Sequence, residues 1–296
     1  MVHHEKCPLC GSDNISDKLE CADHLVSNER FGICECNSCG FVFTQDCPEE
    51  NTIGKYYESE EYISHSDISK GLTNKLYQAV RRVMLKRKRN LVKKITGLSH
   101  GTLLDIGSGT GHFASIMMNS GWEVKGIEIN DSARTYSKEH FNISALSPAG
   151  LSDLQSTSFD CITLWHVLEH FHDPFYYISE IKRLLKPNGK CVIALPNYSS
   201  YDAGYYGKFW AGYDVPRHLW HFSPESFRLF CDKTGLRLSG WHTLPLDVFY
   251  ISQLSERHRD SSAALVRGLA KASVFALRAL LKRERTSSLI YVVEVA

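Results

Sequence analysis

The sequence predicts an α/β protein with a doubly wound parallel sheet, and three consecutive features of the chain support this fold class. The apolar run Thr102–Ile106 is typical of a buried strand in a parallel sheet. Three glycines follow it, and residues 113–118 begin a helix. A second strand is expected at Glu123–Ile129. Strand, glycine turn, helix and strand form the unit from which doubly wound sheets are built.

Two acids mark the glycine turn as a ligand site. Asp105 stands just before Gly107, Gly109 and Gly111, and Glu128 closes the next strand. Glycine leaves room for a ligand to lie against the backbone and the first N–H groups of the helix. In a doubly wound fold, an acid at the place of Glu128 holds a ribose by its two hydroxyls.

Two later segments continue the same order of elements. Residues 159–164 form another apolar run, which delivers Trp165 and His166 to the carboxyl edge of the sheet, where such folds bind ligands. Residues 184–197 contain the end of a helix, a Pro-Asn-Gly turn and a further apolar strand.

With these motifs the chain resembles the class I S-adenosylmethionine (SAM)-dependent methyltransferases, whose glycine spacing is G-x-G-x-G behind an acid. The resemblance implies a Rossmann-like sheet of seven strands, with the last strand antiparallel, and SAM as the cofactor. The third strand, expected near 143–146, is poorly marked, and the residue that contacts the adenine stays unassigned. The implied cofactor-binding residues are Asp105, Gly107, Gly109, Gly111, Glu128, Trp165 and His166.

The first 48 residues are expected to form a small zinc-ribbon-like module. Cys7 and Cys10 form one C-x-x-C pair and Cys36 and Cys39 another, each followed by glycine. Two such pairs predict a tetrahedral zinc site, and four thiolates leave no position for a water, so the ion is expected to be structural. A segment this small lacks the core to fold without such a support. The alternative is a set of reduced cysteines in a small core.

Composition indicates an ordinary globular chain. It has 296 residues and a net charge of +1, which gives no reason to expect a nucleic-acid partner. No apolar signal core and no membrane-spanning run is present, and ten cysteines without a secretory signal favour thiols or metal over disulfides. A cytoplasmic location is expected.

Residues 49–98 are expected to form a helical lid and linker. Tyr56, Tyr57 and Tyr62 lie in a polar stretch, which by analogy with the family is a candidate lid. A long helix is predicted over 72–96 because its apolar residues follow helical spacing. Its basic run, Arg81–Lys94, is interpreted as a solvated face, with a phosphate-binding patch as the alternative.

The methyltransferase domain is expected to span residues 99–296. After the fifth strand comes a loop rich in Tyr, Trp, His and Arg, which runs into Pro216–Pro224. This run resembles a group of bacterial methyltransferases that carry an N-terminal four-cysteine knuckle, some of which act on sugars. In this fold such a loop is expected to form the acceptor pocket. The alternative is that the aromatic loop only covers the core. Ser223 is expected to cap a helix with Pro224 at its first position.

Histidines are the candidate catalytic residues. His218 and His221 lie in the acceptor loop, and His166 lies at the sheet edge. Imidazole titrates near neutral pH and suits a general base. Glu169 and His170 follow His166 in the order H-x-x-E-H, which is not the H-E-x-x-H of zinc enzymes, so no metal is expected there. Local hydrogen bonding in a helix turn explains these two residues equally well.

An insert of about forty residues, 246–288, separates the last two expected strands, 236–243 and 289–295. Within it, 263–285 is predicted to be one amphipathic helix, which would contact an anionic membrane surface and present a lipid-linked acceptor, or pack on its own domain or a second subunit. Its basic residues, Arg267, Lys271, Arg278, Lys282 and Arg285, fall opposite Leu265, Leu269, Ala276 and Leu280. The oligomeric state is left open.

The sequence therefore predicts a SAM-dependent methyltransferase that acts on a small-molecule or carbohydrate acceptor, including nucleotide- or lipid-linked ones. Two alternatives remain. An RNA base methyltransferase is suggested by the basic run and the cysteine knuckle, and a non-catalytic SAM-binding module would follow if the acceptor pocket had decayed.

Overall fold

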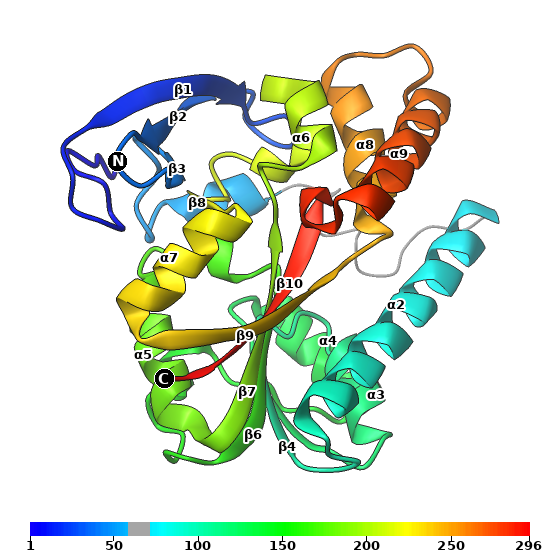
Figure 1. The fold of residues 1–296 in the computed structure, drawn as a ribbon. Coiled ribbons are helices and arrows are strands. Elements are labelled where there is room, and N and C mark those ends of the chain that lie inside the picture. The colour runs from blue at the N-terminus through cyan, green and yellow to red at the C-terminus, as the bar shows by residue number, and fades with distance from the viewer. Residues whose placement is uncertain (59–71) are drawn as a thin grey trace.

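A mixed sheet of six strands lies at the centre of the computed structural model, which describes residues 1–58 and 72–296, the latter with backbone alone at 72–77 and 79 (Figure 1). Four of its strands are joined by parallel pairing, and β10 runs antiparallel to both its neighbours. The spatial order is β5 (Glu123–Ile127), β4 (Thr102–Ile106), β6 (Phe159–Trp165), β7 (Leu185–Pro196), β10 (Ser288–Val295) and β9 (Leu236–Thr243). The predicted Rossmann-like α/β class with an antiparallel last strand is confirmed.

The expected count of seven strands is wrong for the described residues, because the third strand is reduced to one bridge. Leu146 pairs with Ile127 at the edge of the sheet. Ile143 is buried, whereas Leu146 stays exposed. A segment that buries one large apolar side chain gains too little to extend the ladder further.

Helices cover both faces of the sheet (Figure 1). The predicted helix 72–96 is confirmed as α2, and the predicted cap of α7 is confirmed, since the Ser223 side chain accepts the Ser226 N–H with Pro224 at the first position. On one face lie α2 (Leu72–Thr96), α3 (His112–Met118) and α4 (Asp131–Phe141), and on the other α5 (Pro174–Leu184) and α7 (Pro224–Thr234).

The N-terminal residues form a second sheet that is completed by the acceptor loop. Its order is β1 (Ile15–Ala22), β2 (Arg30–Cys36), β3 (Val42–Thr44) and β8 (Trp220–His221). Val42 pairs with His221, and Phe43 with Trp220. The Phe41 ring stacks on Trp220 with 6.0 Å between ring centroids. The module and the catalytic domain therefore share one hydrophobic core.

Short helical turns shape the loops at the carboxyl edge. Tyr57 belongs to the first of them, while the lid prediction for Tyr62 lies outside the described residues. The helix α6 (Tyr201–Tyr206) is followed by single 3-10 turns, which bring the chain to the acceptor loop. The 3-10 segments are Ile53–Tyr57, Pro148–Leu151, Leu168–His170, Gly207–Phe209, Ala211–Tyr213 and Arg283–Arg285.

The insert forms two packed helices rather than the single helix predicted. α8 (Asp247–His258) was missed, and α9 (Ala264–Leu281) ends four residues early, before a 3-10 turn. The two helices approach closely at Gly268, where an added Cβ would lie 2.7 Å from the Gln253 Cα. Glycine is required there by the neighbouring backbone.

The face of α9 that packs on the domain is not the predicted leucine face. The helix buries Gly268, Ala272, Phe275 and Ala279, a stripe beside the basic arc. Leu265, Leu269 and Leu280 point away from the core and are exposed. Small residues permit close packing on α8, so they occupy the interface while the leucines face outward. Within the described residues, no helix has the length and apolar character needed to span a membrane.

Candidate cofactor and acceptor site

The glycine loop after β4 has a backbone that only glycine adopts readily. Gly107, Gly109 and Gly111 have φ values of +72°, +52° and +81°. A Cβ at Gly107 would lie 2.4 Å from a Val167 methyl carbon, and one at Gly111 would lie 2.3 Å from the Ser137 hydroxyl oxygen. Positive φ and close neighbours together exclude other residues at these two positions.

Glu128 closes the loop from the neighbouring strand. One carboxylate oxygen accepts the Gly109 N–H at 2.7 Å, and the other accepts the Asn130 N–H at 2.9 Å. Each oxygen keeps a further lone pair for a ligand hydroxyl. The side chain is thus positioned beside the glycine loop, where the sequence expected it.

Asp105 lies fully buried beneath the loop. It accepts a hydrogen bond from the Thr163 hydroxyl at 2.6 Å. Burial raises the pKa of its carboxyl to about 7, against the opposing influence of Thr163 and the Lys88 ammonium. A carboxyl with this pKa is ready to ionise when a cation binds next to it.

Lys88 is a site residue that the sequence analysis missed, because it counted among the solvated basic residues of α2. Its ammonium lies 4.3 Å from the centre of the Trp165 ring. Burial lowers its pKa, and the charges of Asp247 and Asp105 oppose this shift. Lys88 faces the sheet because of the way α2 packs on it, and the sequence alone does not distinguish Lys88 from the exposed basic residues next to it.

His166 follows β6 with a φ of +59° and is held between two carboxylates. Its Nε2 lies 3.2 Å from Asp247, and its Nδ1 lies 3.6 Å from Glu169. Burial alone would lower the pKa of His166, but the neighbouring carboxylates of Asp247 and Glu169 outweigh burial and raise this pKa to about 9. His166 is therefore a cation at neutral pH. Asp247 comes from α8, and no sequence signal linked it to this site.

Glu169, His170 and His218 meet beneath the acceptor loop. The His218 Nε2 lies 4.0 Å from a Glu169 carboxylate oxygen, and the rings of His170 and His218 are 4.6 Å apart. The Glu169 side chain is 1% exposed, and neither of its oxygens has a hydrogen-bond partner among the described residues. The Glu169 carboxylate therefore does not form the local hydrogen bonds of a helix turn that the alternative interpretation expected.

His221 occupies a different environment from His218. Its Nε2 lies 3.0 Å from the Thr44 hydroxyl, on the strand β3 that pairs with β8. Burial, followed by the nearby charge of His218, lowers its pKa well below the usual value. The structure therefore brings His166 and His218 to the same carboxylate, Glu169, and places His221 against the N-terminal sheet.

Arg217 fixes the acceptor loop to the N-terminal sheet. Its guanidinium lies 2.9 Å from Asp23 and 2.7 Å from Asp214, and it donates a hydrogen bond to the Tyr56 carbonyl. Burial alone would raise the pKa of Asp214, but Arg217 holds it near 2. Both members of the Arg217–Asp23 pair are fully buried. Loss of either side chain would therefore leave the other as an uncompensated buried charge.

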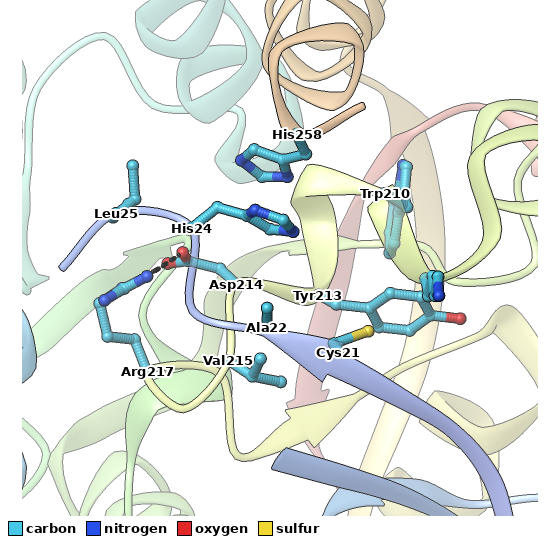
Figure 2. A pocket seen from close by; sticks show the side chains of 11 residues that line it. Cys21, Ala22, His24, Leu25, Trp210, Tyr213, Asp214, Val215, Arg217 and His258 are labelled. Atoms are coloured by element: carbon cyan, nitrogen blue, oxygen red, sulfur yellow. Dashed lines mark hydrogen bonds and ion pairs between the residues drawn. The ribbon is translucent and has the colours of Figure 1, made fainter. Parts of the chain in front are cut away.

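A small cavity lies at this seam between β1 and the acceptor loop (Figure 2). His24 and His258 stack over it with ring centroids 4.1 Å apart, and Asp214 and Arg217 form part of its wall. Its volume of about 10 Å³ matches roughly one water molecule. It is too small for a methyl acceptor.

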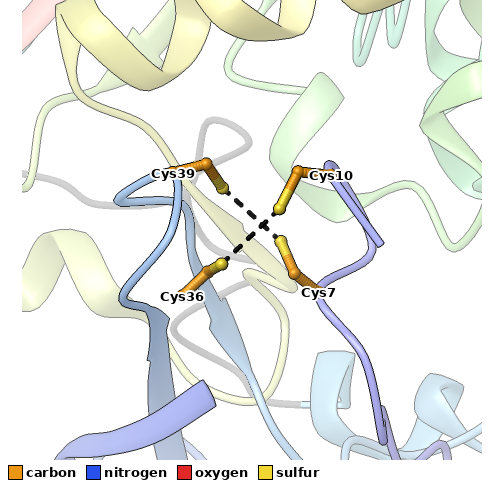
Figure 3. A group of neighbouring side chains, drawn as sticks. All are labelled: Cys7, Cys10, Cys36 and Cys39. Carbon is orange, nitrogen blue, oxygen red and sulfur yellow. Dashed lines mark hydrogen bonds between the residues drawn. The ribbon is translucent and has the colours of Figure 1, made fainter. Parts of the chain in front are cut away.

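The four predicted cysteine ligands converge in the N-terminal module (Figure 3). Their sulfur atoms lie within 4.8 Å of one another, and the Cys7–Cys39 and Cys10–Cys36 pairs are 3.6 Å apart. Four thiolates around one ion with bonds of about 2.3 Å are about 3.8 Å apart. Burial alone would raise the pKa of Cys36, but backbone N–H groups of Ser38 and Cys39 lower it to about 7. The donor set fits a tetrahedral zinc site.

This fold, with its glycine loop and flanking acids, defines a class I methyltransferase. A family profile described as "Methyltransferase domain" matches residues 77–239, more than half of the chain. The chain belongs to that family and is a SAM-dependent methyltransferase.

Curated relatives support the same class. The chain is 27% identical over 174 residues to the ubiquinone biosynthesis O-methyltransferase of Actinobacillus pleuropneumoniae serotype 7, covering 52% of this chain and 74% of that protein. It is 27% identical over 158 residues to the enzyme of the same name from Methylococcus capsulatus, covering 49% and 67%. A solved SAM-dependent methyltransferase from Archaeoglobus fulgidus is 19% identical, with a TM-score of 0.48 over 72% of this chain and 93% of that one.

Proposed function

We propose that this methyltransferase transfers the methyl group of SAM to a hydroxyl oxygen of a small-molecule acceptor, carbohydrate acceptors included. The observation that carries the proposal is the group formed by the buried Glu169 and His218 with the half-buried His166, at the carboxyl edge of the sheet next to the glycine loop. The names of the relatives, which are O-methyltransferases, support oxygen as the methylated atom.

In this proposal the cofactor lies along the glycine loop. Gly107, Gly109 and Gly111 admit its methionine and ribose parts against the backbone, and Glu128 accepts the ribose hydroxyls. Asp105 orients the loop and pairs with the cationic amino group. Trp165 and His166 lie near the sulfonium. SAM is already an activated donor, so the protein mainly positions the two reactants.

His218 fits the role of general base better than the other two candidate histidines. His166 is already protonated at neutral pH and has no vacant lone pair for a proton. His221 is buried with its Nε2 against the Thr44 hydroxyl of β3. His218 directs its Nε2 to the Glu169 carboxylate, which would stabilise the imidazolium formed when the acceptor hydroxyl loses its proton.

Zinc bound by Cys7, Cys10, Cys36 and Cys39 is part of this proposal as a structural ion. Four thiolates complete its coordination and leave no open position for chemistry. The ion would brace the sheet whose fourth strand, β8, carries His221 and lies next to His218. Its role is to hold the acceptor loop in place.

A lipid-linked acceptor is favoured by the outer face of α9. Leu277, Leu280 and Leu281 are 65%, 74% and 89% exposed, and the same helix and the turn after it carry a row of arginines and lysines. Exposed leucines beside basic residues suit the surface of an anionic membrane. The RNA alternative has less support, because Lys88 of the basic run is directed to Trp165 within the site.

Methyl transfer from labelled SAM to a panel of phenols, sugars and lipid-linked alcohols tests the proposal, after calorimetry with SAM and S-adenosylhomocysteine. We expect saturable binding of both cofactors and transfer to an oxygen acceptor. His218→Ala should retain cofactor affinity and lose at least a hundredfold in turnover. Full turnover in the His218→Ala/His221→Ala double variant would remove the loop from catalysis, and a folded protein that binds neither cofactor would overturn the proposal.

A further inference from the structure

We propose that Glu169, His170 and His218 bind a divalent transition-metal ion on the acceptor side of the site. Their ligand atoms lie within 4.8 Å of one another, and they come from the loop after β6 and from the acceptor loop. Ion binding does not depend on the proposed methyl transfer. The use of the ion to hold an acceptor oxygen does rest on that function.

The distances need only a small contraction to form a site. The His218 Nε2 and the nearest Glu169 oxygen are 4.0 Å apart. Ligands of one ion with bonds of about 2.1 Å lie about 3–4 Å apart. The His218–Glu169 pair is thus close to the separation that one ion requires, and the separations that involve His170 are at most 4.8 Å.

The outer nitrogens of both histidines are already engaged as they are in metal sites. His218 has its Nδ1 3.0 Å from the Gly212 carbonyl, and His170 has its Nδ1 3.1 Å from the Arg217 carbonyl. A carbonyl oxygen accepts only, so the Nδ1 of His218 carries the proton and its lone pair is on Nε2. The His170 Nδ1 lies 3.1 Å from the Tyr57 hydroxyl as well, and the tautomer in which it donates to the Arg217 carbonyl leaves the Nε2 lone pair for the ion. Histidines that bind metals typically donate their second N–H in this manner.

Glu169 supplies the independent observation that points to a cation. Both its oxygens are buried and lack hydrogen bonds within the described part of the chain. A buried carboxylate in this state is costly unless a positive charge lies next to it. His166, with its Nδ1 at 3.6 Å, supplies part of that charge, and the His218 Nε2 faces the same carboxylate at 4.0 Å. A divalent ion would satisfy the carboxylate and both rings at once.

Two imidazoles and one carboxylate suit Zn²⁺, Mn²⁺, Fe²⁺ or Co²⁺, and three protein ligands leave coordination positions open. Those positions would take oxygens of the acceptor, which favours acceptors with two neighbouring oxygens, such as an ortho-diphenol or a vicinal diol. Coordination lowers the pKa of the bound hydroxyl, and its proton leaves to solvent when the acceptor binds. In the ion-bound enzyme His218 is then a ligand and no longer the general base.

Cobalt binding tests the proposal without using activity. The full-length protein, with its four-cysteine site filled by one equivalent of Zn²⁺, is titrated with Co²⁺ and followed by absorption spectroscopy and metal analysis. We expect one further equivalent to bind, with d–d bands and without the sulfur-to-cobalt charge transfer that a cysteine site would produce. Wild-type protein that takes up no second equivalent would overturn the proposal.

Variants then assign the ligands. Glu169→Gln and His218→Gln should each weaken Co²⁺ binding at least tenfold. The matched control is His172→Gln, because His172 is a nearby histidine of the same loop whose Nε2 contacts the Pro48 carbonyl and lies outside the cluster. Thermal unfolding checks that each variant is folded, and equal Co²⁺ affinity in the wild type and in folded Glu169→Gln would also refute the site.

The outcomes separate this inference from the proposed function. A second ion without any methyl transfer would retain the metal site and remove the function. Transfer that proceeds at full rate in protein shown to hold zinc at the cysteines alone would retain the function, with His218 as base, and remove the metal site.

Discussion

Asp105 is a carboxyl group whose burial works against the stability of the protein and in favour of its ligand. An exposed aspartate has a pKa of about 3.9, and burial raises that of Asp105 to about 7. Between these values the folded state binds a proton that the unfolded state has released, so the ionised group destabilises the fold increasingly as pH rises. A cationic ligand next to Asp105 offsets this cost.

Asp105→Asn is therefore expected to raise the unfolding temperature of the ligand-free protein at pH 8, by a margin that shrinks as the pH falls to 5. The same variant should lose SAM affinity, because it lacks the carboxylate that we propose as the partner of the cofactor's amino group. In the wild type, SAM binding should weaken roughly five- to tenfold from pH 7.5 to pH 6, as Asp105 takes up its proton. Calorimetry and thermal unfolding measure both effects, and a pH-independent affinity would contradict the assignment.

Arg217 is the residue on which the contact between the two sheets most depends. Replacement of Arg217 by Met leaves Asp23 and Asp214 buried without their common partner. Loss of one member of a buried ion pair costs about 3–5 kcal/mol. Urea unfolding should report a loss of this size.

The matched control is Arg30→Met, which removes an exposed pair with Glu20 at 2.8 Å. Such pairs contribute less than about 1 kcal/mol. Similar losses of unfolding free energy in the two variants would show that the contribution of the Arg217 pair does not depend on its burial.

At the scale of elements, α9 presents two kinds of surface. Gly268, Ala272 and Ala279 are buried together with Phe275, whereas the leucines face outward. We expect the wild type to sediment with phosphatidylcholine vesicles that contain phosphatidylglycerol, and to remain in solution with phosphatidylcholine alone. The Leu277→Glu/Leu281→Glu variant should lose this binding.

Phe175→Glu/Tyr176→Glu on α5 is the control, since these side chains are also exposed but lie on a different helix. If the leucines instead cover a second copy of the chain, ultracentrifugation of the wild type will show a dimer that the α9 variant abolishes. Absence of vesicle binding by the wild type would contradict the membrane proposal.

At the scale of the whole molecule, the N-terminal module packs into the loop that we propose to bind the acceptor, and is not an appendage beside it. Its sheet takes its last strand from the acceptor loop, and Thr44 donates its hydroxyl hydrogen to the His218 carbonyl at 2.7 Å. The glycine loop, by contrast, belongs to the central sheet alone. The proposed acceptor and cofactor sites thus depend on different parts of the structure.

Removal of zinc, or Cys39→Ser, is therefore expected to abolish methyl transfer and to expose residues 214–222 to proteases, with SAM affinity changed less than about threefold. Calorimetry and limited proteolysis followed by mass spectrometry measure these effects. Cys231→Ser, at a buried cysteine outside the cluster, is the control. Equal loss of SAM affinity and transfer would show that the module supports the whole fold and not the acceptor loop specifically.

The central features of this protein could be predicted from its sequence because they depend on local patterns. Apolar runs set the strands, helical spacing set α2, and Ser223 with Pro224 set the start of α7. The cysteine pairs identified their own cluster, since C-x-x-C spacing brings two sulfurs to one point whatever the surrounding fold. The glycine turn and its acids indicated the cofactor class for the same reason.

Only the tertiary structure decided the composition of the acceptor site and of the insert. Asp247, Lys88 and His218 reach the site from distant segments, and no periodicity in the sequence links them to Glu169. The face of α9 that points outward depends on which of its side chains are small enough to pack against α8. Amphipathic spacing in the sequence does not determine this. Caps, turns and C-x-x-C pairs depend on residues that are neighbours in the sequence, so the sequence determined them. The pairing of buried charges depends on packing between elements, which places residues from distant segments within a few ångströms of one another.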